Sequence, residues 1–204
     1  MGCAVSMFYK QGSDPALTSP YSSLLDVPAV DIDGKHIERL GDVLSGKKCM
    51  LISNVSSKWA FTDEHYTQFV ELHTELSAKG FEILAFPSNQ FFTQEPGTNK
   101  EIKSLVRNFY EAEFLLFEKS DVNGPATNEV FKFLRANTPE FNSKGSDQLK
   151  QIPWNFSKFL VNKEGKVVAF YDTKISPSKL KSKILQILES ESWSIFWLPK
   201  FLEA

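Results

Sequence analysis

Apolar and polar positions alternate along this chain in a way that predicts an α/β fold. Residues 49–55 and 81–86 are short apolar runs of the length of buried strands. Between them, apolar side chains recur at helical spacing from Tyr66 to Leu76, and Gly80 ends the pattern. Two apolar strands joined by such a helix form a parallel crossover unit, which should be right-handed.

Further elements are predicted on both sides of this unit. Residues 27–35 predict a small hairpin with its turn at Asp33-Gly34. Thr98 and Glu101 have the spacing of a capping box, which predicts that a helix begins there. The crossover unit is therefore expected to be part of a larger sheet with several helices.

The second half of the chain supplies the remaining elements. Pro125 is expected at the first position of a helix, and residues 137–151 form a polar loop. Residues 156–161 and 167–171 predict a hairpin, and Pro177 begins a closing helix. The order β-α-β, helices, β-β-α predicts a thioredoxin-like fold, in which a central mixed β-sheet is flanked by helices.

Composition indicates one globular domain with short extensions. The chain has 204 residues, 42% of them hydrophobic, and a formal charge of −2, so no basic excess favours nucleic acid. We expect a tail at 1–20, the domain at 21–190 and an aromatic tail at 191–204. Cys3 and Cys49 are too few for a disulfide scaffold and favour a reducing compartment. No apolar run approaches the ~20 residues of a membrane span.

Trp59 stands where the first apolar run gives way to the helix, just before a predicted N-cap at Thr62. Unpaired N–H groups and the helix dipole at such a position favour an anion, for example a thiolate. An indole offers one N–H donor and no acceptor. The turn thus has the electrostatics of a nucleophile site without a nucleophile.

Four blocks in the same order resemble the glutathione peroxidase family, in particular its phospholipid-hydroperoxide type. They are residues 54–59 with Thr62, 83–97, 121–124 and 154–159. The resemblance runs from Tyr21 to Leu188. It implies a thioredoxin fold and thiol-dependent reduction of hydrogen peroxide or lipid hydroperoxides, with no bound cofactor and with glutathione or another thiol as the reductant.

The resemblance also implies a catalytic constellation. The family's selenocysteine or cysteine, which attacks the peroxide, matches Trp59, and the family's supporting residues match Gln94, Trp154 and Asn155. Their N–H donors are suited to holding a chalcogenolate and polarising a peroxide oxygen. The support is therefore expected to be present around a position that lacks the reactive atom.

Three other positions depart from the family pattern: Ser88 and Val106 stand where some members have cysteine, and Ala60 replaces a glycine. A two-cysteine mechanism recycled by thioredoxin is therefore excluded. Two interpretations of Trp59 remain open. Either it is a genuine tryptophan in a pseudoperoxidase that binds partners or supports structure, or a UGA-encoded selenocysteine has been rendered as tryptophan in an active peroxidase.

The N-terminus predicts lipidation. Gly2, with Ser6 at the expected spacing, matches the pattern for myristoylation, and Cys3 is placed for palmitoylation. Two acyl chains anchor a protein stably, so we expect it at the cytoplasmic face of a membrane and otherwise in the cytosol. The aromatic tail either sits at a lipid interface or folds back on the domain. The loop at 137–151 lacks the long insertion of tetrameric relatives, which predicts a monomer.

No metal site is predicted from the histidines. His36, His65 and His73 are scattered along the chain and have no companion ligands. His65 and His73 are expected on helix surfaces.

Overall fold

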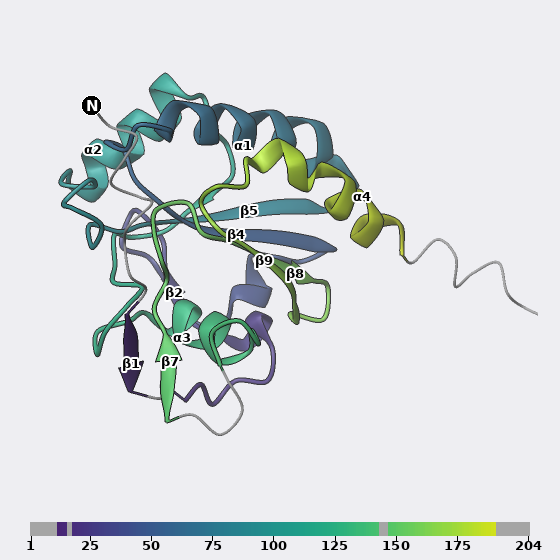
Figure 1. Ribbon diagram of the computed structural model, residues 1–204. Coiled ribbons are helices and arrows are strands. Elements are labelled where there is room, and N and C mark those ends of the chain that lie inside the picture. Colours follow the sequence, from purple (N-terminus) through teal and green to yellow (C-terminus); the bar gives the residue numbers. More distant parts are fainter. Residues whose placement is uncertain (1–11, 16–17, 143–146, 191–204) are drawn as a thin grey trace, which may run out of the picture.

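The structure is a computed structural model that describes residues 12–15, 18–142 and 147–190 (Figure 1). The predicted lipidation sites Gly2 and Cys3 and the aromatic tail lie outside the described residues. None of the described helices combines the length and the apolar composition that a membrane span requires.

The centre of the molecule is a mixed five-stranded sheet with strand order β6-β5-β4-β8-β9. β4, β5 and β6 are parallel, whereas β8 and β9 are antiparallel to their neighbours. The predicted thioredoxin-like α/β fold is confirmed. In sheet order the strands are β6 (Leu115–Leu116), β5 (Phe81–Pro87), β4 (Cys49–Val55), β8 (Lys158–Asn162) and β9 (Val167–Tyr171).

Helices cover both faces of this sheet, because the side chains of β4 alternate between two apolar clusters. Cys49, Leu51 and Val55 face the cluster beneath α1 and α4, while Met50 and Ile52 face the cluster that contains α3 (Figure 1). The helices are α1 (Thr62–Leu76), α2 (Asn99–Ser104), α3 (Glu129–Ala136) and α4 (Lys181–Glu189), with a π-helical turn η5 (Leu105–Phe109) and the 3₁₀ turns η2 (Leu24–Asp26), η3 (Leu40–Asp42), η4 (Ser77–Lys79) and η6 (Pro177–Leu180).

Two small sheets flank the central one. β2 (Ala29–Val30) pairs with β3 (His36–Ile37), as the predicted hairpin requires. β1 (Ser13–Pro15) pairs with β7 (Gln148–Lys150). β1 lies within the stretch expected to be a tail, and β7 lies within the expected polar loop, so paired structure extends further than the sequence pattern indicated.

One predicted helix start is confirmed and one is wrong. Thr98 and Glu101 form the expected capping box at the start of α2. The prediction of a helix beginning at Pro125 fails, because Pro125 lies in a turn and α3 begins four residues later. Asn128 supplies the cap instead, since its side chain accepts a hydrogen bond from Phe131 N.

Candidate active site

The turn between β4 and α1 holds Trp59 just before the helix N-terminus, as expected. The backbone N–H of Trp59 donates to Thr62 Oγ1 at 3.0 Å, and Thr62 Oγ1 donates to the carbonyl oxygen of Ser56 at 2.9 Å. Phe61, one residue earlier than predicted, occupies the N-cap position. The Thr62 hydroxyl therefore shapes the turn.

The indole of Trp59 is half-buried and packs among other rings. Its centroid lies 5.0 Å from that of Phe61, 5.3 Å from that of His65 and 5.7 Å from that of Phe156, on which it stacks at an interplanar angle of 26°. Such offset contacts stabilise beyond the area they bury. Trp59 thus contributes to packing between α1 and the segment that leads into β8.

Two of the predicted supporting residues contact each other directly. Asn155 Nδ2 donates to Gln94 Oε1 at 2.6 Å. The carbonyl oxygen of Gln94 accepts hydrogen bonds from Ser56 Oγ at 2.7 Å and from Lys58 N at 3.0 Å. Gln94 therefore links the segment containing Asn155 to the turn that carries Trp59.

Trp154 is buried beside Asn155. Its carbonyl oxygen accepts a hydrogen bond from Asn54 Nδ2 at 3.0 Å, which ties it to the end of β4. Its ring contacts Phe91 and Phe92, with centroids 5.8 and 5.3 Å away. The four predicted site residues thus lie on three segments that hydrogen bonds and ring contacts hold together.

Glu95 and Lys158 are buried ionisable groups that sequence reasoning missed. Glu95 accepts a hydrogen bond from Ser57 Oγ at 2.6 Å, and burial raises its pKa to about 7. Lys158 Nζ donates to the carbonyl oxygens of Phe156 and Asp172 at 2.5 and 3.1 Å, and burial lowers its pKa to about 7. Lys158 stands within the apolar strand predicted at 156–161, and this was the available signal, whereas nothing local marks Glu95 as buried.

The predicted surface position of His65 is wrong, whereas His73 lies partly exposed on α1. His65 is 3% exposed, its Nδ1 lies 3.0 Å from the carbonyl oxygen of Phe61, and burial lowers its pKa to about 4. His73 is half-buried and its Nε2 lies 2.9 Å from Glu82 Oε1. His65 lies four residues before Phe69, a spacing that places both on the buried face of α1. Among the described residues, no group of three or more His, Cys, Asp or Glu side chains could hold a metal ion.

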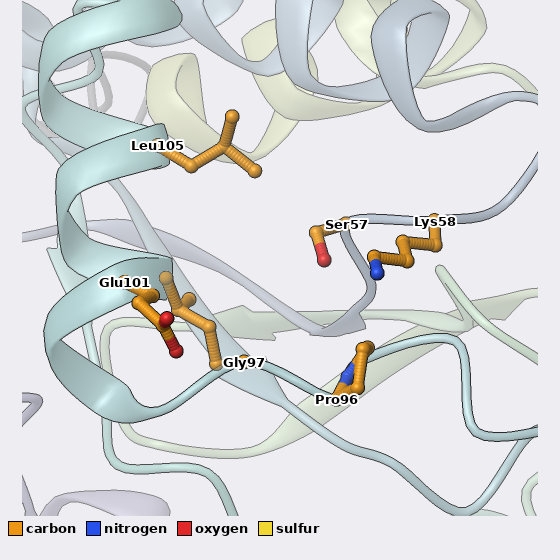
Figure 2. A pocket seen from close by; sticks show the side chains of 7 residues that line it. Ser57, Lys58, Pro96, Gly97, Glu101 and Leu105 are labelled. Carbon is orange, nitrogen blue, oxygen red and sulfur yellow. The ribbon is translucent and has the colours of Figure 1, made fainter.

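A pocket of about 390 Å³ opens beside the turn, between Ser57-Lys58 and the first turns of α2 (Figure 2). Lys58 and Glu101 give it one cationic and one anionic side chain. No thiol lines it; the residues are Ser57, Lys58, Pro96, Gly97, Glu101, Ile102 and Leu105.

Among the residues that the structure describes, Cys49 is a free cysteine. It is fully buried in β4, and burial raises the pKa of its thiol to about 12. Thiolate, the nucleophilic form, is therefore scarce at Cys49 at neutral pH. Val106, which stands where some members of the resembling family have cysteine, is also fully buried.

Comparison with known proteins identifies the family. Residues 24–135 match the family model described as glutathione peroxidase. Among curated relatives, two Arabidopsis thaliana proteins, putative glutathione peroxidase 7 (chloroplastic) and phospholipid hydroperoxide glutathione peroxidase 1 (chloroplastic), are 43% and 42% identical over 81% and 80% of this chain. The matches span 67% and 65% of those longer proteins. Probable glutathione peroxidase 5 of the same plant is 41% identical over 79% of this chain and 88% of its own length.

Solved structures agree with these relatives. Trgpx in its apo form is 25% identical, covers 82% of this chain and 96% of its own, and superposes with a TM-score of 0.63. T. cruzi GPX1 is 27% identical, covers 82% of this chain and 97% of its own, and has a TM-score of 0.60. A thioredoxin-family thiol:disulfide interchange protein from Chlorobium tepidum, at 12% identity and a TM-score of 0.57 over 84% of this chain and 99% of its own, shares the fold alone. This chain belongs to the glutathione peroxidase family.

Proposed function

We propose that this chain is a pseudoperoxidase, a family member that has lost peroxide reduction and acts as a membrane-tethered binding or structural protein. In the family reaction a selenolate or thiolate attacks the O–O bond of the peroxide. One oxygen stays on the chalcogen as a selenenic or sulfenic acid, and the other leaves as water or an alcohol. Two thiols then reduce the acid. The carbon and nitrogen atoms of Trp59 supply no such nucleophile.

The packing of Trp59 carries this proposal. Its indole fills the turn against Phe61, His65 and Phe156 at centroid distances of 5.0 to 5.7 Å. The thiol of Cys49 is buried in the sheet and cannot replace the missing group. The turn is therefore built around an aromatic ring and, among the described residues, has no thiol beside it.

A second candidate is an active peroxidase with selenocysteine at position 59. The hydrogen bond between Asn155 and Gln94, and the position of the turn at the N-terminus of α1, favour it because both would support a selenolate. Its reductant would be glutathione or another thiol. Mass spectrometry of the native protein decides between the candidates, since tryptophan and selenocysteine at residue 59 give different peptide masses.

Recombinant protein with Trp59 should give no peroxide-dependent oxidation of NADPH above a blank when coupled to glutathione and glutathione reductase. The double variant Trp59→Cys/Ala60→Gly should give measurable turnover, because the helix N-terminus, Gln94 and Asn155 would then stabilise a thiolate. Trp59→Ser in the same background is the matched control and should stay inactive. Turnover by the Trp59 protein would refute the pseudoperoxidase proposal.

Membrane attachment forms the second part of the proposal. It is supported by Gly2 and Cys3 in the acylation pattern and places the protein at the cytoplasmic face of a membrane. One myristoyl chain alone binds marginally, so Cys3 supplies the second anchor.

A further inference from the structure

Two exposed phenylalanines, Phe61 and Phe92, form what we call the aromatic rim. They are 39% and 63% exposed. The Phe61 ring contacts Trp59, and the Phe92 ring contacts Trp154 at 5.3 Å. Trp59 in turn stacks on Phe156, two residues after Trp154. The carbonyl oxygen of Gln94, two residues after Phe92, accepts a hydrogen bond from Lys58 N at 3.0 Å, so the loop that carries Phe92 adjoins the turn that carries Phe61.

The backbone that presents Phe92 is strained. Phe92 and Thr93 have φ angles of 50° and 53°, in the left-handed region that bulky side chains rarely adopt. Neighbouring hydrogen bonds hold this loop in place: Gln90 Oε1 accepts from Val122 N at 2.8 Å and from Asn123 N at 2.9 Å. An exposed apolar ring on strained backbone does not stabilise the fold. Such backbone outliers therefore point to a function.

The chain enters the fold close to this rim. The carbonyl oxygen of Gly12 accepts a hydrogen bond from Gln151 N at 2.8 Å, and Asp14 Oδ1 accepts one from Gln151 Nε2 at 2.7 Å. Gln151 precedes Trp154 by three residues, which limits their separation to about 11 Å. The segment that carries Gly2 therefore joins the fold beside the loop against which Phe92 packs.

A buried ion pair fixes this entry point. Arg135 Nη2 lies 2.7 Å from Asp14 Oδ2, and the two side chains are 0% and 7% exposed. Arg135 also donates to the carbonyl oxygen of Lys150 at 3.1 Å, and Asp14 Oδ2 accepts from Gly124 N at 2.9 Å. Breaking such a fully bonded buried pair leaves an uncompensated charge, so β1 is held firmly.

We infer that the aromatic rim inserts into the interface of the lipid bilayer to which the N-terminus is attached, so that the site faces the membrane. The inference rests on the proposed attachment for its tether and adds a folded surface to it. From Gly2 to Gly12 an extended chain reaches at most about 36 Å, which keeps the rim near the bilayer. Aromatic rings are suited to the boundary between headgroups and acyl chains.

The charges beside Phe61 do not form a basic patch. Lys58 is basic, while Asp63 and Glu64 in the first turn of α1 are acidic, so this part of the rim has no net positive field. Insertion of rings should therefore depend little on ionic strength, in contrast to binding through a basic patch.

Vesicle sedimentation tests the inference on the full chain produced without acylation. With phosphatidylcholine vesicles, Phe61→Ser/Phe92→Asn should lower the partition coefficient on the order of tenfold, because the two rings that would be buried in the lipid interface are lost. Asparagine is chosen at position 92 because it tolerates the left-handed backbone. Val168→Ser is the matched control, since Val168 is 42% exposed but lies on β9, an edge strand of the central sheet that carries no part of the rim. It should change partitioning by less than about twofold, and so should raising the salt concentration.

Equal partitioning of the wild type and the double variant would overturn the inference. A wild type that does not bind vesicles would also overturn it, as would a wild type that binds a protein through the rim instead. If the double variant does not melt cooperatively, Phe92→Asn alone provides the comparison. Because the measurement uses unacylated chain, its failure is distinct from failure of acylation, which is tested in cells.

Discussion

Glu95 is a buried carboxyl group whose ionisation the fold opposes at neutral pH. Burial raises its pKa from the ordinary 4.5 to about 7, although Ser57 donates a hydrogen bond to it and Lys119 and Lys58 favour its charge. A raised carboxyl pKa stabilises the fold at low pH, where Glu95 is protonated in both states. That stabilisation is fully present below pH 4.5 and is lost as the pH rises towards 7.

Glu95→Gln should remove this pH dependence, because glutamine stays neutral while keeping an acceptor for Ser57. The midpoint of urea unfolding of the variant, relative to the wild type, should therefore rise between pH 4.5 and pH 8. Glu113→Gln, which changes an exposed carboxylate, is the control and should keep a constant difference. A constant difference for Glu95→Gln as well would show that Glu95 ionises normally.

How much of the site the sequence could predict also depends on single residues. The motif blocks predicted Trp59, Gln94, Trp154 and Asn155, and the structure places them on adjoining segments. The buried state of Glu95 could not be predicted, since it arises from packing of distant segments and not from its local pattern. The ring contacts of Trp59 likewise join residues that are 97 positions apart.

Among the elements, β1 and β7 are short polar strands that the pattern of apolar residues does not predict. Each has three residues, with only the central one buried, and their partners are more than 130 positions apart. Periodicity needs longer runs, so the long strands and α1 were predictable and these two were not. Nothing in the sequence around Asp14 on β1 predicts its ion pair with Arg135 on α3.

Removing Asp14 should destabilise the whole fold. Asp14→Ala leaves the buried Arg135 charge unpaired, and the free energy of unfolding should fall by about 3–5 kcal/mol in urea titrations at pH 7. Asp14→Leu/Arg135→Met should recover most of the loss, because neither charge remains. Asp26→Ala is the matched control: its ion pair with Arg39 is also 2.7 Å long but is exposed, so a loss of no more than about 1 kcal/mol is expected. Equal losses for Asp14→Ala and Asp26→Ala would contradict the assigned role of β1.

At the scale of the whole molecule, the order of the elements was predictable, because the blocks from 54 to 159 fall on one α/β topology. The helix at Pro125 was misplaced since Asn128, not the proline, supplies the cap. Pairing between the ends of the chain and its middle, as at β1, depends on the complete fold and could not be derived from any one segment.

Attachment to a membrane is a property of the full chain and can be tested in cells. Gly2→Ala should move the protein from the membrane fraction to the soluble fraction, because it removes the myristoylation site and with it the anchor that acts with Cys3. Cys3→Ser should release it partly, since one acyl chain binds marginally. Ala4→Ser leaves both sites intact and is the control. Unchanged fractionation of Gly2→Ala would exclude N-terminal acylation as the anchor.

Because Cys49 is buried, the rate at which its thiol is chemically modified reports transient opening of the central sheet. Its side chain is fully buried on β4, and burial holds its thiol in the protonated form. An alkylating reagent can reach the sulfur only when β4 separates transiently from β5 or β8. The rate of Cys49 modification therefore measures how often the native sheet unfolds locally. Variants that add no cysteine can be compared by this rate when the modified Cys49 peptide is followed separately from Cys3.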